Sequence, residues 1–208
     1  MNGQNRGERG AARRGAGLHV VVRALLPDEL VLVEELLPSQ ERDVHARRLA
    51  TQRSGSATYF IAWLGDRPVG HTLVRWGGSG NPLLARPDAP APAHPYIEGL
   101  AVHQAYRSRG IGSQVIAAAE HDATRRGYRE IGLAVGVENV RARALYVRLG
   151  YRDLGLGEFP NIWSYRDDAG QRHVEIESCI YLLKSLRPAD EAAASGASAS
   201  DDASTEHG

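Results

Sequence analysis

The chain has 208 residues, of which 42% are apolar and 24% are charged, and its 25 basic and 25 acidic side chains balance to zero net charge. This length fits one domain of ordinary size, and the composition excludes a wholly disordered chain, a collagen-like chain and a membrane bundle. No apolar run reaches the roughly 20 residues of a spanning helix, and the start lacks the apolar segment of a secretory signal. We therefore expect a cytoplasmic protein without membrane contact. The single cysteine, Cys179, excludes an internal disulfide and a multi-cysteine zinc site, and no metal is expected.

Both ends of the chain are predicted to be disordered. Residues 1–17 form an Arg/Gly-rich arm with four arginines and one glutamate, and residues 188–208 form an acidic Ala/Ser tail without lysine or arginine. Neither segment can bury enough apolar surface to offset the entropy of ordering it. The folded domain is therefore expected over residues 18–187. The arm has too few charges to favour a nucleic-acid partner over a solvated tail.

Between the tails, hydrophobic periodicity predicts seven strands and four helices. A strand at 19–25 precedes a helix that Asp28 can cap and Pro38 ends, and a charge-rich helix follows at 39–53. The other strands are expected at 58–64, 69–76, 96–102, 131–135, 151–156 and 173–183, and the other helices at 110–126 and 140–149. Two segments are interpreted as loops, the Pro-rich 77–95, which could form a substrate lid, and 159–165. This order fits an α/β (α+β) fold with a mixed sheet and helices on both faces.

The strand at 96–102 leads into the segment Arg107-Ser108-Arg109-Gly110-Ile111-Gly112, after which a helix begins at once. Glycines at such a turn let the backbone approach a ligand closely, and the helix start presents unpaired N–H groups that suit a diphosphate. The two arginines add charged donors. The turn lacks the Gly-Lys-Ser/Thr ending of a Walker loop and the third glycine of a dinucleotide fingerprint.

The spacing Arg107-x-x-Gly110-x-Gly112 resembles the acyl-CoA motif of the GNAT superfamily of N-acetyltransferases. A second segment resembles the helix that follows in that family, with Asn139, Ala142 and Tyr146 at its asparagine, small-residue and tyrosine positions, before Leu149-Gly150-Tyr151. The resemblance covers roughly residues 18–187. It implies a mostly antiparallel central sheet that is splayed between the fourth and fifth strands, with acetyl-CoA in the gap.

The resemblance also implies how acetyl-CoA is held, without a metal. Main-chain groups of Leu100, Ala101 and Val102 would pair with pantetheine like an added strand. Asn139 would hydrogen-bond pantetheine, and Tyr146 would reach the thioester sulfur. The pyrophosphate would be held by Arg107 and by the amides of Ser108, Arg109, Gly110, Ile111, Gly112 and Ser113.

For the reaction, the resemblance implies direct transfer of the acetyl group to an amine in a ternary complex. The Val102 amide would stabilise the oxyanion, and Tyr146 is the candidate general acid for the leaving sulfur. Glu98, on the strand beside acetyl-CoA, is the candidate base. His71 and His103 are rivals, and an amine that arrives uncharged would need no base.

The acceptor is expected to be a small amine. Glu34, Glu35, Glu41 and Asp43 lie in the helical segment where acceptor specificity would reside and could favour a cationic amine, although they could equally form a solvated helix face. The alternatives are a non-catalytic acyl-CoA sensor and an enzyme that acetylates protein or peptide amines. An acceptor pocket could include Trp63, Trp76 or Trp163, although strand aromatics are more often core residues. A homodimer is compatible with the resemblance.

Overall fold

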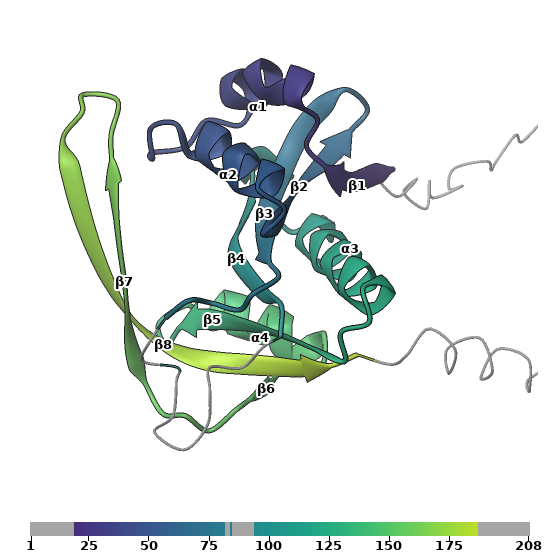
Figure 1. Ribbon diagram of the computed structural model, residues 1–208, viewed down its shortest axis with the longest axis vertical. Coiled ribbons are helices and arrows are strands. Elements are labelled where there is room, and N and C mark those ends of the chain that lie inside the picture. Colours follow the sequence, from purple (N-terminus) through teal and green to yellow (C-terminus); the bar gives the residue numbers. More distant parts are fainter. Residues whose placement is uncertain (1–18, 82–83, 85–93, 187–208) are drawn as a thin grey trace, which may run out of the picture.

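The computed structural model describes residues 19–81, 84 and 94–186, coloured along the sequence in Figure 1. The expected tails at 1–17 and 188–208 lie outside these residues. Most of the Pro-rich loop at 77–95, which was expected to form a substrate lid, also lies outside them. The described helices are η1 (Pro27–Glu29), α1 (Leu30–Leu36), α2 (Val44–Arg53), η3 (Gln104–Tyr106), α3 (Ile111–Arg125) and α4 (Val140–Arg148). The described strands are β1 (Val20–Ala24), β2 (Ala57–Leu64), β3 (Arg67–Arg75), β4 (Tyr96–Val102), β5 (Glu130–Gly136), β6 (Arg152–Asp153), β7 (Phe159–Arg166) and β8 (Arg172–Ser185). No helix among the described residues is long and apolar enough to cross a membrane.

The strands form one sheet in the order β1-β2-β3-β4-β5-β8-β6, with β7 paired to β8. Every pairing is antiparallel except that of β4 with β5, which is parallel. The parallel pairing covers only Tyr96–Gly132 and Ile97–Leu133, after which the two strands diverge. Figure 1 shows β1 to β4 as one half of the sheet and β5, β8 and β6 as the other. The predicted splay between the fourth and fifth strands is therefore confirmed.

Helices cover both faces of the sheet, as predicted, because alternate side chains of each strand point to opposite faces. On β2, Tyr59 and Ile61 pack in one cluster with Val33 of α1 and Leu49 of α2. Phe60 packs on the other face, in a cluster with Ile116, Ala119 and Ala123 of α3 and Tyr146 of α4. The site where β4 and β5 part is thus flanked by α2 on one side and by α3 and α4 on the other.

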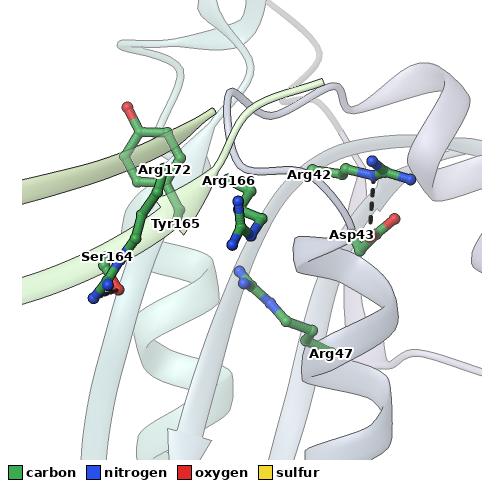
Figure 2. Close-up of a pocket in the computed structure, with 7 residues that line it drawn as sticks. All are labelled: Arg42, Asp43, Arg47, Ser164, Tyr165, Arg166 and Arg172. Carbon is green, nitrogen blue, oxygen red and sulfur yellow. Dashed lines mark hydrogen bonds and ion pairs between the residues drawn. The ribbon is translucent and has the colours of Figure 1, made fainter. Parts of the chain in front are cut away.

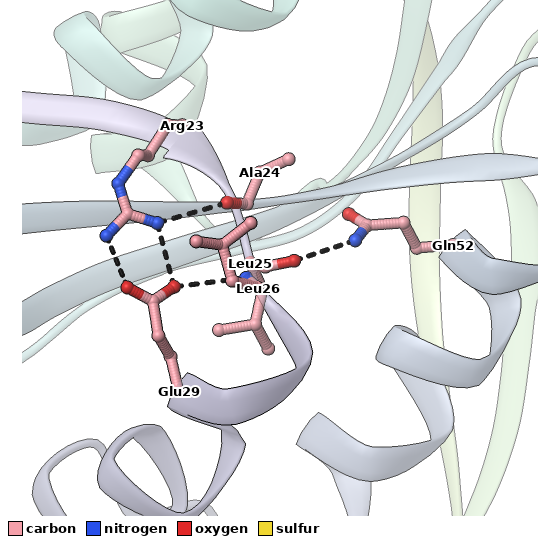
Figure 3. Close-up of polar contacts among 6 residues, drawn as sticks. All are labelled: Arg23, Ala24, Leu25, Leu26, Glu29 and Gln52. Atoms are coloured by element: carbon pink, nitrogen blue, oxygen red, sulfur yellow. Dashed lines mark hydrogen bonds and ion pairs between the residues drawn. The ribbon is translucent and has the colours of Figure 1, made fainter.

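The first strand is tied to the helices that follow it by a small set of polar contacts (Figure 3). Arg23 forms an ion pair with Glu29, whose Oε2 also accepts a hydrogen bond from the Leu26 amide at 3.0 Å. Gln52 of α2 donates to the Leu25 carbonyl at 2.8 Å and accepts from the Tyr59 amide at 2.8 Å. One side chain therefore holds α2 against β2 and against the residue that follows β1.

A bulge interrupts β4 at Gly99, which has a φ of +63° that side chains other than glycine rarely adopt. The register with β3 shifts there, from Leu73–Glu98 to His71–Ala101. A Cβ on Gly99 would also collide with the guanidinium of Arg48, which packs against this point of the strand. The bulge thus bends β4 away from β5 at the start of the gap.

Four sequence predictions differ from the structure. Asp28, expected to cap the first helix, lies within η1, and no side chain of the described residues caps α1. Residues 159–165, interpreted as a loop, belong to β7, which pairs with β8 over its whole length. Most β7 side chains are exposed and Pro160 lies near its start, so the hydrophobic pattern of a strand is weak. The helix expected at 39–53 begins only at Val44, and the strand expected at 151–156 is reduced to Arg152–Asp153.

Candidate active site

A cleft of about 740 Å³ opens where β4 and β5 diverge. Its walls come from β4, β5, α2, α4 and the β7–β8 hairpin, which are far apart in the sequence. Four predicted site residues line it together: Glu98, Leu100, Asn139 and Tyr146. The fold therefore brings the candidate base and the candidate acid into one cavity from opposite sides of the gap.

Glu98 precedes the bulge on β4 and is held by an ion pair. Arg75 at the end of β3 places its Nε 2.5 Å from Glu98 Oε2. The Glu98 carbonyl accepts a hydrogen bond from the Thr72 hydroxyl at 3.2 Å. Both the carboxylate and its strand are thus fixed in position, while about a third of the Glu98 side chain remains accessible from the cleft.

Tyr146 lies on α4, and only 7% of its surface is exposed. Its ring packs edge-on to Tyr151 within the main core cluster, with the ring centres 5.8 Å apart. Its hydroxyl forms no hydrogen bond to any described residue. Burial raises the pKa of the Tyr146 phenol to about 12, so this group keeps its proton at neutral pH. It can therefore act as a proton donor.

Asn139 caps α4, because its Oδ1 accepts a hydrogen bond from the Ala142 amide at 3.1 Å. The asparagine thus has a structural role that its sequence position alone did not show. Capping uses only the amide oxygen. The Nδ2 group donates to no described residue and is a candidate donor to a ligand in the cleft.

The predicted pyrophosphate turn lies outside the lining of this cleft, at the start of α3. Arg107, Ser108, Arg109 and Gly110 are exposed, Ile111 is buried, and Gly112 and Ser113 are half-buried. Gly110 has a φ of +80°, and no side chain within the described parts of the chain caps the helix, so the first amides of α3 have no capping partner there. A Cβ on Gly110 would meet open space, whereas one on Gly112 would touch the side chains of Leu100 and Leu145.

Arg141 joins this turn to α4 and was not predicted. It donates a hydrogen bond to the Ser108 hydroxyl at 2.6 Å, and Ser108 itself has a left-handed φ of +63°. Arg141 lies in the first turn of α4, where a cation interacts unfavourably with the helix dipole. This position is the one sequence signal that could have pointed to Arg141. The contact places another guanidinium beside the candidate phosphate site.

The remaining predicted cofactor contacts lie on β4 after the bulge. Ala101 and Val102 pair with β3, and neither lines the cleft, whereas Leu100 does. Beyond Ile97, no β4 residue pairs with β5 in the described structure. The Val102 carbonyl accepts a hydrogen bond from Arg107 Nε at 3.0 Å, which ties the strand to the turn. This edge of β4 therefore faces the gap unpaired.

Neither rival histidine lines the cleft. His71 is buried, contacts the His45 and Tyr59 rings, and accepts a hydrogen bond at Nδ1 from Arg48 at 2.7 Å. Burial and the nearby Arg48 charge hold the pKa of His71 well below its usual value, so its ring is neutral. His103 accepts a hydrogen bond from the Ala105 amide at 3.3 Å and thereby caps η3. The geometry thus favours Glu98 among the candidate bases.

The cleft also contains residues that sequence reasoning did not select. Arg48 reaches it from α2, and Glu177 reaches it from β8, where its carboxylate packs against Gly136. Trp163 of β7 lines the cleft, whereas Trp63 and Trp76 are buried core residues. Helical or strand periodicity carried no signal for Arg48 and Glu177, because these two residues reach the cleft only through the sheet topology.

The acidic residues expected to favour a cationic acceptor are not free in the cleft. Glu41 lines it but forms an ion pair with Arg47 at 2.7 Å, and Asp43 pairs with Arg42 at 3.4 Å. Glu34 and Glu35 do not line it. These carboxylates therefore leave little unpaired negative charge for binding a cation.

No cluster of three or more His, Cys, Asp or Glu side chains that could hold a metal occurs within residues 19–81, 84 and 94–186. Cys179 is buried, and burial together with the neighbouring Glu177 raises the pKa of its thiol to about 12. A thiol with so high a pKa is a poor nucleophile.

Comparison with known proteins agrees with this geometry. A sequence model of the acetyltransferase (GNAT) family matches residues 23–151. Among solved structures, the ribosomal-protein-S18-alanine N-acetyltransferase from Escherichia coli has a TM-score of 0.54 and 15% identity, covering 82% of this chain and 96% of its own. The putative acetyltransferase yncA from Salmonella typhimurium, solved with acetyl-CoA, has a TM-score of 0.55 and 14% identity, covering 81% and 94%.

A third structure, Arabidopsis thaliana NAA60 in complex with a bisubstrate analogue, has a TM-score of 0.55 and 17% identity and covers 82% of this chain and 99% of its own. No curated protein matches the chain. The structural likenesses concern the fold, and the family match spans most of the chain. The chain therefore belongs to the acetyltransferase (GNAT) family.

Proposed function

We propose that this protein transfers the acetyl group of acetyl-CoA to a primary amine by direct attack in a ternary complex. The observation that carries the proposal is the position of Glu98 and Tyr146, which line one cleft from β4 and α4 at the point where the sheet splits. A sensor would need neither a carboxylate nor a protonated phenol in that cleft.

The residues around the gap fit coenzyme A. The uncapped amides of α3 and the open space over Gly110 suit a pyrophosphate, with Arg107, Arg109 and Arg141 as charged donors. The unpaired edge of β4 at Leu100 to Val102 suits an extended pantetheine chain, which would add to the sheet as a strand does. The Asn139 Nδ2 group is a further donor beside that path.

When bound, acetyl-CoA supplies an activated acetyl group as a thioester. Glu98 takes a proton from the attacking amine, through a water molecule, while Arg75 holds the carboxylate in place. The Val102 amide donates a hydrogen bond to the oxyanion of the attacked carbonyl, a kind of contact worth about 3 kcal/mol. Tyr146 donates its phenolic proton to the departing sulfur.

The test combines calorimetry with a free-thiol assay. We expect acetyl-CoA to bind, and we expect the purified protein to release thiol only when an amine is present, with one acetylated amine per thiol. Binding without thiol release for any small amine or peptide N-terminus would favour the sensor. Absence of binding would refute the proposal altogether. The expected homodimer stays a prediction, which light scattering can test. The cytoplasmic location also stays a prediction.

A further inference from the structure

A second pocket, of about 440 Å³, lies between the start of α2 and the β7–β8 hairpin and has no part in the proposed chemistry. Four arginines line it, and Figure 2 shows that they come from both elements: Arg42, Arg47, Arg166 and Arg172. The Arg42 amide donates a hydrogen bond to the Arg166 carbonyl at 2.7 Å, so the backbone joins the two walls. We name it the arginine pocket.

Positive charge in the arginine pocket is only half neutralised. Arg42 and Arg47 have carboxylate partners, as described above. Arg166 donates to the Gly170 carbonyl at 2.7 Å and Arg172 to the Ser164 hydroxyl at 3.5 Å, and both acceptors are neutral. Neither of these two arginines has a carboxylate partner within the described part of the chain.

The two unpaired arginines also face each other directly across the hairpin, in the register Arg166–Arg172. Like charges in opposite positions of a strand pair destabilise the pair. In addition, Figure 2 shows the guanidinium groups of Arg47 and Arg166 pointing toward one another across the pocket. An oxyanion between Arg47 and Arg166 would relieve their repulsion, because a planar guanidinium binds carboxylate or phosphate through two parallel hydrogen bonds. Figure 2 shows the Arg172 guanidinium beside Ser164, where it adds positive charge at the edge of the same pocket.

The arginine pocket adjoins the catalytic cleft, because Arg47 and Ser164 line both cavities. We infer that the acceptor is a small primary amine whose far end carries an oxyanion, a carboxylate or a phosphate, held by Arg47, Arg166 and Arg172. This inference rests on the proposed function. It assigns a negative charge to the acceptor, whereas the acidic residues of the sequence suggested a cationic acceptor.

The experiment compares amines of equal chain length, from three to eight carbons, that end in a carboxylate, a phosphate, a hydroxyl or a second amine. With the unaltered protein, we expect the best anionic substrate to exceed its hydroxyl counterpart at least tenfold in kcat/KM, which corresponds to about 1.4 kcal/mol. The carboxylate and phosphate arms identify the group. Raising the salt concentration should reduce the preference, because the arginines are exposed.

The double variant Arg166→Gln, Arg172→Gln should bring this preference to within twofold and leave the hydroxyl substrate unaffected, since neither residue lines the catalytic cleft. Arg67→Gln is a control for the loss of an exposed positive charge as such, because it removes one charge at the start of β3, outside both cavities. The inference fails if amines are acetylated without preference for the anion, if the preference survives the double variant, or if an acidic peptide outperforms every small amine.

Failure of the proposed function would look different, because no amine of any charge would then be acetylated. Titration with inorganic phosphate decides the matter in that case. Phosphate binding that persists in Arg67→Gln and disappears in the double variant supports an oxyanion site, whereas equal binding in all three proteins, or none, overturns it.

Discussion

Replacing Tyr146 by phenylalanine separates its proposed chemical role from its structural one. The ring is buried against Tyr151 and stays in place, and the hydroxyl that is lost forms no hydrogen bond to a described residue. The free energy of unfolding should therefore change by no more than about 0.5 kcal/mol. Loss of a general acid costs about 10²- to 10⁴-fold in rate, or roughly 3–5 kcal/mol of barrier.

The assay is the initial rate of thiol release at saturating acetyl-CoA and amine, with a rapid-quench measurement to establish that acetyl transfer limits the rate. Because burial holds the pKa of this phenol near 12, the unaltered protein should show no alkaline loss of kcat from Tyr146 below about pH 11. Thermal unfolding of the same samples reports stability.

Tyr128→Phe is the matched control. Its hydroxyl donates to the Trp76 carbonyl at 3.2 Å, and the residue does not line the cleft. We expect this variant to lose about 1 kcal/mol of stability and to keep its kcat. A Tyr146→Phe protein that transfers acetyl groups at the unaltered rate, with transfer limiting, would refute the assignment of the acid.

Three further outcomes are expected. Glu98→Gln should lower kcat/KM at neutral pH by about 10²-fold or more, and the kcat/KM of this variant should recover as the pH approaches the pKa of the amine. A deficit in kcat/KM that is equal at every pH would contradict the base role. Lys184→Met should lower the free energy of unfolding in urea by about 2 kcal/mol, because the Glu120 carboxylate, 2.6 Å from Lys184 Nζ, would lose its cation while its side chain is only 17% exposed; an unchanged midpoint would show that the pair contributes nothing. Burial lowers the pKa of His45 and His71 from 6.5, so below pH 6.5 the unfolded chain takes up protons that the folded protein does not. Each histidine should therefore reduce the free energy of unfolding by up to about 1.4 kcal/mol per pH unit in that range. Thermal scans should therefore show flat stability above about pH 7.5 and a decline toward pH 5.5, and equal stability at both ends would contradict the burial of these rings.

The local sequence was sufficient to predict the bounds of those elements whose apolar run and flanking turn residues lie within a few positions of each other. The predicted strand at 96–102 agrees with β4 at both ends, and the β2–β3 hairpin lies within two residues of its predicted bounds. In each case, the sequence combines an apolar or β-branched run with turn residues beside it, and these signals act over a few positions. The glycine turn before α3 was recognised for the same reason.

The β7 strand was missed because its stability does not come from burial. Its side chains are mostly exposed, and its order comes from backbone pairing with β8 from Phe159–Cys179 to Arg166–Arg172. Such pairing depends on a partner elsewhere in the chain, which a hydrophobic pattern does not reveal. The arginine pocket was not predicted for the same reason, because half of its arginines belong to the β7–β8 hairpin.

The sequence by itself determined which residues could carry the chemistry, since the second motif names Asn139 and Tyr146 and the strand before the first motif contains Glu98. Only the tertiary structure decided what each of them contacts. The ion pair of Glu98 with Arg75 spans 23 positions, and the contact of Arg141 with Ser108 spans 33. Strand register and the splay of the sheet create these pairs, and both are set by packing between distant segments, which no local run of residues encodes.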